Sequence, residues 1–225
     1  MSGFAVVGTG TGVGKTVVTA GLVGWLRAAG REALAVKPAQ TGYPPDDDAG
    51  YVADACGTDA AATCLRRLEP ALAPEVAADV ADVELSYAAL REGVETAVAG
   101  ADPGVVEGIG GLRVPLADGR EVLDLVADLE LPVVVVADSG LGTLNHSALT
   151  VQAARERGLT VSGVVLNRYE GATLAERTNP DVLAEMVDAP VHTLPPLELT
   201  TPADAVTGVR AHLPADVFPD GYGPD

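Results

Sequence analysis

Residues Gly8–Thr16, with the sequence GTGTGVGKT, have the types and the order of a P-loop that binds nucleotide phosphates. Glycines allow consecutive backbone N–H groups to point into one concavity, and the N-terminus of a following helix adds partial positive charge. We expect Lys15 to reach the β- and γ-phosphates and Thr16 to offer its hydroxyl to Mg²⁺. Five residues separate Gly8 from Gly14, one more than in the common motif. The extra residue affects which subfamily of P-loop proteins the chain would match, and it leaves the prediction of phosphate binding unchanged.

Lysine is scarce in this chain, which makes each lysine a candidate for function. Of 14 basic residues only Lys15 and Lys37 are lysines, and 32 acidic residues give a net charge of −18. So acidic a chain is a poor ligand for nucleic-acid phosphates, and we expect no nucleic-acid partner. The composition is typical of a salt-loving organism or of a genome biased towards alanine, valine and arginine. We expect Lys37 to bind a phosphate or carboxylate and to have no role in the core.

Acidic residues supply candidate ligands for Mg²⁺. Glu107 closes an apolar strand next to glycines, where many P-loop enzymes hold the metal. Three aspartates at 46–48 follow two prolines, and a solvated helix N-cap is the alternative interpretation of that run. Because Mg²⁺ prefers hard oxygen ligands and Thr16 plus Glu107 leave its shell open, we expect Asp48 to supply a further ligand. Which of the three aspartates meets the metal stays open.

Short apolar runs alternate with helical stretches along most of the chain, without internal repeats. This alternation predicts an α/β fold with a mostly parallel, doubly wound sheet. Together with the P-loop after the first strand, it resembles a P-loop NTPase of the SIMIBI-like type. Strands are expected at 4–7, 33–36, 105–107, 132–137, 159–166 and 191–194. Helices are expected at 17–29, 49–56, 60–68, 87–98, 121–129, 141–157, 180–187 and 202–211. Residues 69–84, interrupted by Pro70 and Pro74, are assigned no regular structure.

The chain is long enough for one domain with its own core, which we place at residues 1–217. The tail at 218–225, rich in glycine and proline, is expected to fray. The N-terminus resembles no signal peptide and no stretch has the length of a membrane span, so we expect a cytoplasmic location. Cys56 and Cys64 lack a metal-binding spacing and are expected to be reduced thiols, with a disulfide as the alternative.

Parallel sheets bind ligands at the carboxyl ends of their strands. The candidate residues all follow strands in this way, so we expect them at one edge of the sheet. They are Lys15 and Thr16 after the first strand, Lys37 after the second, Glu107 after the third, Gly142–Asn145 after the valine-rich strand and Asn167 after the next. The three histidines show no metal spacing and are expected to be structural.

Five segments together resemble the dethiobiotin synthetase family over nearly the whole chain and in the same order. They are GTGTGVGKT at 8–16, KPAQTG at 37–42, DDDA at 46–49, VEGIGG at 106–111 and LGTLNH at 141–146. The longer P-loop is also found in that family. The resemblance implies a ligase that converts 7,8-diaminononanoate, CO₂ and ATP to dethiobiotin, ADP and phosphate, the penultimate step of biotin biosynthesis. The implied intermediates are a carbamate and a carbamic–phosphoric anhydride.

The resemblance also implies roles for individual residues. Lys37 and Lys15 would be catalytic, and Thr16, Asp48 and Glu107 would hold Mg²⁺. The residues implied in ATP binding are Gly12, Val13, Gly14, Lys15, Thr16, Val17, Asp48, Glu107, Gly108, Ile109, Gly110, Asn167, Arg168, Pro195, Pro196 and Leu197. The residues implied in substrate binding are Thr11, Thr41, Gly142, Thr143, Leu144 and Asn145. The last four would bind the substrate carboxylate of the other subunit, which implies a homodimer.

Two alternatives remain in the sequence. Arg168 stands where an acidic residue would match the adenine-binding pattern better. We therefore expect the protein to discriminate weakly between ATP, CTP and GTP. A MinD- or ParA-like switch ATPase, which forms no small-molecule product, would share the same sheet edge. Such ATPases carry a second lysine near the start of the P-loop, where this chain has Gly10, and often end in a membrane helix.

Overall fold

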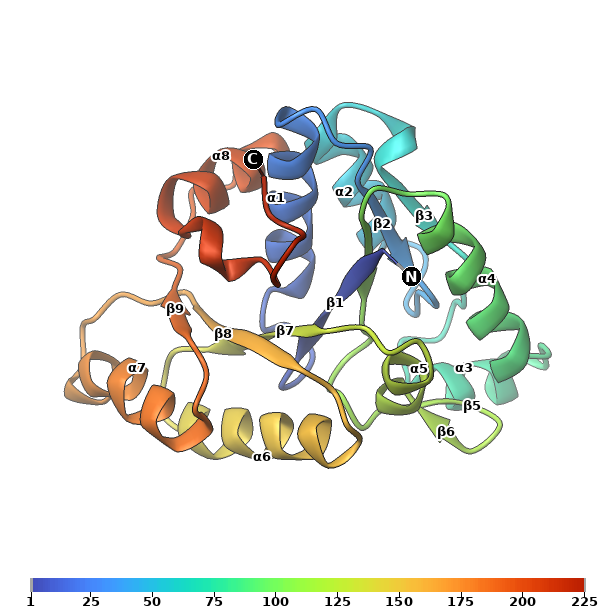
Figure 1. The fold of residues 1–225 in the computed structure, drawn as a ribbon. Helices are drawn as coiled ribbons and strands as arrows, with labels where there is room; N and C mark the ends of the chain where they lie inside the picture. Colours follow the sequence, from blue (N-terminus) through green and yellow to red (C-terminus); the bar gives the residue numbers. More distant parts are fainter. Residues whose placement is uncertain (1, 225) are drawn as a thin grey trace.

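A seven-stranded parallel sheet runs through the centre of the computed structural model, which describes residues 2–224 (Figure 1). The strand order is β3-β2-β4-β1-β7-β8-β9, and each paired neighbour is parallel. The strands are β1 (Gly3–Gly8), β2 (Leu34–Lys37), β3 (Ala62–Cys64), β4 (Gly104–Glu107), β7 (Val133–Asp138), β8 (Val161–Asn167) and β9 (Val191–Thr193). A separate antiparallel pair is formed by β5 (Pro115–Ala117) and β6 (Arg120–Glu121). The predicted parallel, doubly wound α/β fold is confirmed.

Helices cover both faces of this sheet (Figure 1). One face is covered by α1 (Lys15–Ala28), α2 (Asp48–Cys56) and α8 (Ala203–His212). The other face is covered by α4 (Tyr87–Ala99), α5 (Val122–Asp128), α6 (Thr143–Glu156) and α7 (Leu174–Val187). The remaining helical elements are α3 (Pro74–Ala81) and the short 3-10 turns η1 (Asp59–Ala61) and η2 (Ala215–Val217). No helix within residues 2–224 is long and apolar enough to cross a membrane.

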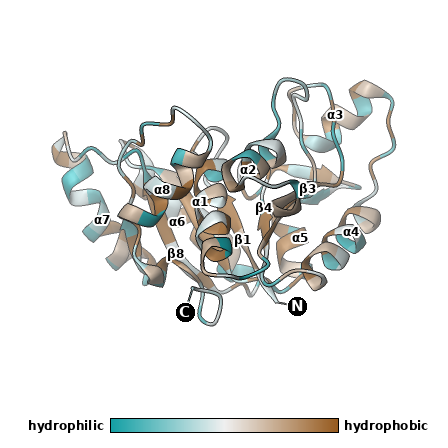
Figure 2. Ribbon diagram, turned by 90° about the horizontal axis from the view of Figure 1, so that it is seen from above, coloured by the Kyte–Doolittle hydropathy of each residue, from teal (hydrophilic) through white to brown (hydrophobic). Residues whose placement is uncertain are grey.

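The valines of β7 show why the central strands read as continuous apolar runs. Val134 and Val136 pack into the core beneath α1, whereas Val133 and Val135 pack into the core on the opposite face. Successive side chains of a strand point to opposite faces, so a strand covered on both sides needs an apolar residue at each position. Figure 2 shows this concentration of hydrophobic residues along the central strands.

Helices α1 and α8 approach each other closely at a glycine. A Cβ atom on Gly21 would lie 2.3 Å from the side chain of Val209, so only glycine fits at this contact. The close approach lets α8 pack against α1 in the core on this face of the sheet.

The C-terminal tail is ordered against the core, and the expected fraying is wrong for its described part. Phe218 is 5% exposed, with its ring 5.3 Å from Trp25 in an edge-to-face contact. Arg31 donates hydrogen bonds to the carbonyls of Tyr222 and Gly223 at 3.1 and 3.0 Å. Aromatic burial therefore outweighs the flexibility expected from the glycines and prolines of this segment.

Three other local predictions differ from the structure. The stretch predicted as a helix at 60–68 forms η1 and then β3, which extends the sheet by pairing with β2. Residues 69–84, which were assigned no regular structure, contain α3, and Pro74 is its first residue. Helix α7 begins before Pro180, because Thr173 and Glu176 form a capping box at its N-terminus.

Candidate active site

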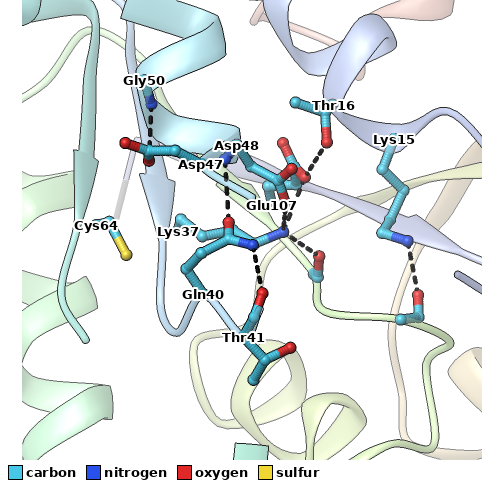
Figure 3. Close-up of polar contacts among 12 residues, drawn as sticks. Lys15, Thr16, Lys37, Gln40, Thr41, Asp47, Asp48, Gly50, Cys64 and Glu107 are labelled. Atoms are coloured by element: carbon cyan, nitrogen blue, oxygen red, sulfur yellow. Dashed lines mark hydrogen bonds and ion pairs between the residues drawn. The ribbon is translucent and has the colours of Figure 1, made fainter. Parts of the chain in front are cut away.

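The P-loop connects β1 to α1, and two glycines give it its shape. Gly12 has a φ of 76° and Gly14 a φ of 96°, in the left-handed region that favours glycine. Lys15 begins α1 (Figure 3), and its Nζ donates to the carbonyl oxygens of Gly10 at 2.9 Å and Gly110 at 2.8 Å. The lysine is therefore folded back over the loop that it would use to bind phosphate.

Asn167, at the end of β8, closes the P-loop from the side. Its Nδ2 donates to the carbonyl of Val13 at 3.0 Å, and its Oδ1 accepts from the backbone N–H of Arg168 at 2.9 Å. A Cβ on Gly14 would lie 2.0 Å from that Nδ2. Both ends of the Asn167 amide are thus satisfied within the chain.

Lys37 and Glu107 end the adjacent strands β2 and β4, which brings their side chains to the same edge of the sheet. Lys37 Nζ lies 2.9 Å from Glu107 Oε1 and 2.5 Å from Asp48 Oδ2, and it donates to the carbonyl of Gly108 at 3.2 Å (Figure 3). Lys37 is 5% exposed and Glu107 is 2% exposed. The expectation that Lys37 has no part in the buried structure is wrong, because its charge sits between two carboxylates.

The two lysines have opposite pKa shifts. Burial works against the charged form of Lys37, but Glu107 and Asp48 outweigh it, and the pKa of Lys37 is raised. Burial and the nearby Lys37 lower the pKa of Lys15 to about 8. Burial also works against the charged form of Asp48, but Lys37 outweighs it and the pKa of that carboxyl is lowered. The charged forms of Lys37 and Asp48 therefore favour each other.

The three aspartates at 46–48 have different positions. Asp47 caps α2 by accepting from the N–H of Gly50 at 3.1 Å, which is the helix-capping role weighed as the alternative for the run. Asp48 faces Lys37, and its backbone N–H donates to Gln40 Oε1 at 3.0 Å. Asp46 lines the cavity described below. Only one of the three carboxylates thus points at the lysine.

The oxygen atoms around Lys37 Nζ form a donor set that fits a divalent cation. Thr16 Oγ1 donates to Glu107 Oε1 at 2.9 Å, and the Asp48 carboxylate contacts the same ammonium. Hydroxyl and carboxylate oxygens are the ligands that Mg²⁺ prefers. In this structure the positive charge that these carboxylates require comes from Lys37.

A cavity of about 560 Å³ adjoins these residues. The sequence-predicted residues that line it are Thr11, Gly12, Gly14, Lys15, Thr16, Lys37, Thr41, Asp48, Ile109 and Gly110. Asp46, which was left open as a metal ligand, also lines it, and the lining residues that the sequence did not indicate are Gln40, Ala71, Leu72, Ala73 and Val114. Gln40 lies within the motif at 37–42 and was the one with a readable signal. The apolar wall at 71–73 comes from the segment that was assigned no structure.

The other candidate residues lie outside this cavity. Gly108 accepts the hydrogen bond from Lys37, and Val17 lies in a shallower hollow beside Thr16. Residues 142–145 begin α6 and do not line the cavity of their own chain. Residues 195–197 follow β9, where Leu197 packs against Gly208 of α8. The structure thus brings together the residues expected to bind phosphate and metal. The residues expected to bind the substrate carboxylate lie away from this cavity, at the start of α6.

Comparison with known proteins identifies the family. A family model described as an AAA domain matches residues 2–204. The ATP-dependent dethiobiotin synthetase BioD of Haloferax mediterranei is 68% identical over 95% of this chain and 92% of its own length. The chain belongs to the dethiobiotin synthetase family. A second enzyme of that name, from Anaeromyxobacter sp., is 41% identical over 83% of this chain and 90% of its own length. The family resemblance seen in the five motifs is confirmed.

Solved structures with a similar fold are nucleotide-binding ATPases. The septum site-determining protein MinD of Pyrococcus horikoshii, complexed with Mg-ADP, has a TM-score of 0.57 at 16% identity and covers 92% of this chain and 86% of its own. A ParA family ATPase of Chlorobium tepidum has a TM-score of 0.59 at 15% identity and covers 93% and 92%. At such identities the likeness shows the fold alone. It therefore does not favour a switch ATPase over a dethiobiotin synthetase.

Proposed function

We propose that this protein is an ATP-dependent ligase that converts 7,8-diaminononanoate and CO₂ to dethiobiotin in biotin biosynthesis. The observation that carries the proposal is the single cavity lined by both lysines, one from a phosphate-binding loop and one between carboxylates. An ATP γ-phosphate and an anionic acceptor can meet there. Membership of the dethiobiotin synthetase family names the acceptor chemistry.

The reaction asks the protein mainly for alignment and charge neutralisation. A substrate amine attacks CO₂ and loses a proton, giving a carbamate. A carbamate oxygen attacks the γ-phosphorus and ADP leaves, giving a mixed anhydride. The second amine then attacks the carbonyl carbon and expels phosphate, which closes the ring. Each intermediate is anionic, so positioned cations and backbone N–H groups stabilise every step.

We assign the phosphate contacts to the P-loop amides from Gly12 to Thr16 and to Lys15, after its ammonium exchanges the carbonyls of Gly10 and Gly110 for phosphate oxygens. We assign Lys37 to the carbamate and the transferred phosphoryl group. Thr11 and Thr41, which line the same cavity, are assigned hydrogen bonds to the diamine and carbamate. The role assigned to Lys37 is tested by the Lys37→Met variant below.

Mg²⁺ would be held by Thr16, Asp48 and Glu107: both carboxylates contact the Lys37 ammonium, and the Thr16 hydroxyl contacts Glu107. Bound there, Mg²⁺ would neutralise charge on the phosphates of the nucleotide. Because Lys37 shares the carboxylates of that donor set, we expect its ammonium to turn towards the cavity when the metal is present. The chain itself then supplies a mobile cation beside the acceptor.

We propose a homodimer in which the N-terminus of α6 binds the distant carboxylate of the substrate held by the other subunit. Helix N-terminal amides favour carboxylates. Residues 142–145 do not line the cavity of their own chain, and the adjacent Leu141 is 97% exposed. Leu149, on the same helix, is 56% exposed. An apolar surface beside a carboxylate-binding helix end fits a subunit contact.

We also propose loose nucleotide preference. The amide of Asn167, the residue implied in reading the base, is already bonded at both ends to the chain itself. Reading adenine would require those hydrogen bonds to break, which weakens discrimination. Initial rates with ATP, CTP and GTP test the proposal, and strict use of ATP would reject it. The cytoplasmic location inferred from the sequence stays a prediction.

The reaction is tested by incubating the purified protein with 7,8-diaminononanoate, bicarbonate, Mg²⁺ and ATP, and by following dethiobiotin by mass spectrometry. We expect one ADP for each dethiobiotin formed, and no product from Lys37→Met. Arg91→Met, which removes an exposed arginine on α4, is the matched control and is expected to retain activity. ATP turnover that ignores the diamine, with no ureido product, would instead indicate a switch ATPase.

The shared site is tested by mixing two inactive variants. Lys37→Met removes the lysine of one site, and Asn145→Asp places a negative charge where the partner's substrate carboxylate is expected. Refolded together in equal amounts, they form mixed dimers with one intact site, so about a quarter of the wild-type activity returns. No recovery, or a species of 22.7 kDa in solution, contradicts the shared site.

A further inference from the structure

Arg168, immediately after β8, adopts an unusual backbone conformation beside the P-loop. Its φ is 56°, in the left-handed region that is unfavourable for residues other than glycine. Its N–H donates to Asn167 Oδ1 at 2.9 Å, and its carbonyl accepts from Ser139 Oγ at 3.1 Å. The surrounding chain thus holds this residue in a strained conformation, which points to a functional reason.

The side chain of Arg168 reaches across the end of the sheet. Its Nη2 donates to the carbonyl of Gly12 at 2.5 Å and lies 2.6 Å from Asp138 Oδ1. Asp138 ends β7, which lies between β8 and β1 in the sheet. A single nitrogen therefore connects β8, β7 and the loop that follows β1.

Arg168 and Asn167 bond two successive peptide groups of the P-loop. Arg168 bonds the carbonyl of Gly12 and Asn167 bonds the carbonyl of Val13. A trans peptide is planar, so its N–H points opposite to its C=O. Fixing these two carbonyls on the outer side therefore turns the N–H groups of Val13 and Gly14 to the opposite, inner side of the loop, where anions bind.

We propose that Arg168 is a positioning residue, which orients the P-loop amides for the nucleotide phosphates instead of contacting the base. The proposal rests on the proposed binding of ATP at this loop. If Arg168 acts through the P-loop backbone, it affects only the binding of the phosphates, which all nucleotides share. Its loss should then weaken the binding of every nucleotide by the same factor. A contact with the base weakens one nucleotide more than the others.

The test measures dissociation constants for ADP, GDP and CDP by calorimetry, together with thermal midpoints. In Arg168→Gly we expect all three constants to rise by a common factor of about three to ten, a moderate effect because the side chain is half exposed. The thermal midpoint does not fall, because glycine accepts a φ of 56° without strain. A purely structural role would instead lower the midpoint and leave affinity unchanged.

Three further variants complete the test. Arg168→Met, which keeps the stem without the donors, is expected to lose the same affinity and serves if the glycine variant does not fold. Arg168→Lys should recover most of the affinity, because one nitrogen makes both contacts in the native protein. Arg91→Ala, an exposed arginine paired within α4, is the control and should bind as the wild type does.

Two results overturn the inference. A change of less than about twofold in every constant of the glycine and methionine variants shows that the loop keeps its shape without Arg168. A loss confined to one base shows a direct base contact. Failure of the wild-type protein to bind any nucleotide would instead reject the proposed function, so the two failures can be told apart.

Discussion

Replacing Lys37 by methionine tests whether one ammonium holds two carboxylates together at the edge of the sheet. The ammonium lies 2.5 Å from Asp48 and 2.9 Å from Glu107, and Glu107 is 2% exposed. Removing one partner of a buried ion pair costs about 3–5 kcal/mol, because a buried charge is left uncompensated. The Asp48 side chain is 28% exposed and keeps some hydration, so we take the lower limit, about 3 kcal/mol.

For a chain of this length about 3 kcal/mol corresponds to a fall of about 6–12 °C in the thermal midpoint. The assay is thermal unfolding at neutral pH in chelator-treated buffer, followed by circular dichroism. Arg91→Met is the matched control. It breaks an exposed pair with Glu95 within α4, worth about 0.3–0.5 kcal/mol, so its midpoint should change by less than about 2 °C.

Added Mg²⁺ provides a second, opposite arm of the same experiment. If the metal and the ammonium use the same carboxylates, Mg²⁺ replaces the charge that Lys37→Met lacks and stabilises the variant more than the wild type. A variant that unfolds within 2 °C of the wild type without divalent ions would refute the ion-pair reasoning. If Mg²⁺ stabilised the wild type more than the variant, the idea that the metal and the Lys37 ammonium use the same carboxylates would be refuted.

Four further outcomes are expected. Gly14→Ala should abolish nucleotide binding in calorimetry, because its Cβ would lie 2.0 Å from Asn167, whereas Gly30→Ala, with a similar φ and open space, should lose stability alone. The pKa of Lys15, near 8 in the folded protein, predicts that the ADP dissociation constant rises as pH increases from 8 to 10, because the free enzyme loses the binding ammonium. The same shift should make the folded protein gain stability over that window, since the unfolded chain holds the proton longer. Phe218→Ala should lower the free energy of unfolding by about 3–5 kcal/mol in denaturant titration while leaving ADP affinity unchanged.

The residues at the edge of the sheet could be predicted because a parallel sheet orders its strand ends. Once β1, β2 and β4 were recognised as apolar runs, Lys15, Lys37 and Glu107 had to follow them at one edge. The motif at 37–42 likewise placed Thr41 and, unrecognised, Gln40 in the cavity. Periodicity and chain order suffice for this level of description, since neither depends on side-chain conformation.

The parts that could not be predicted depend on contacts distant in sequence. Three residues, of which only Thr63 favours a strand, give too weak a local signal, and Ala62–Cys64 forms a strand because the edge of β2 offers backbone hydrogen bonds. The tail carries turn residues throughout, and it is ordered because Phe218 meets Phe4 and Trp25 from the other end of the chain. Local composition indicates the conformation that a segment favours in isolation, whereas burial against the rest of the chain decides its conformation in the folded protein.

The two lysines show the same limit at the level of chemistry. The sequence made both candidates for one anion-binding task, and the structure gives them opposite electrostatic surroundings. Burial and the charge of Lys37 destabilise the Lys15 ammonium, and an anion bound at the P-loop would stabilise it. Lys37 is already neutralised by two carboxylates, so it can act on an acceptor only when another cation takes its place. The surroundings therefore suit Lys15 to the nucleotide phosphates, and they would suit Lys37 to an acceptor if Thr16, Asp48 and Glu107 held a metal ion.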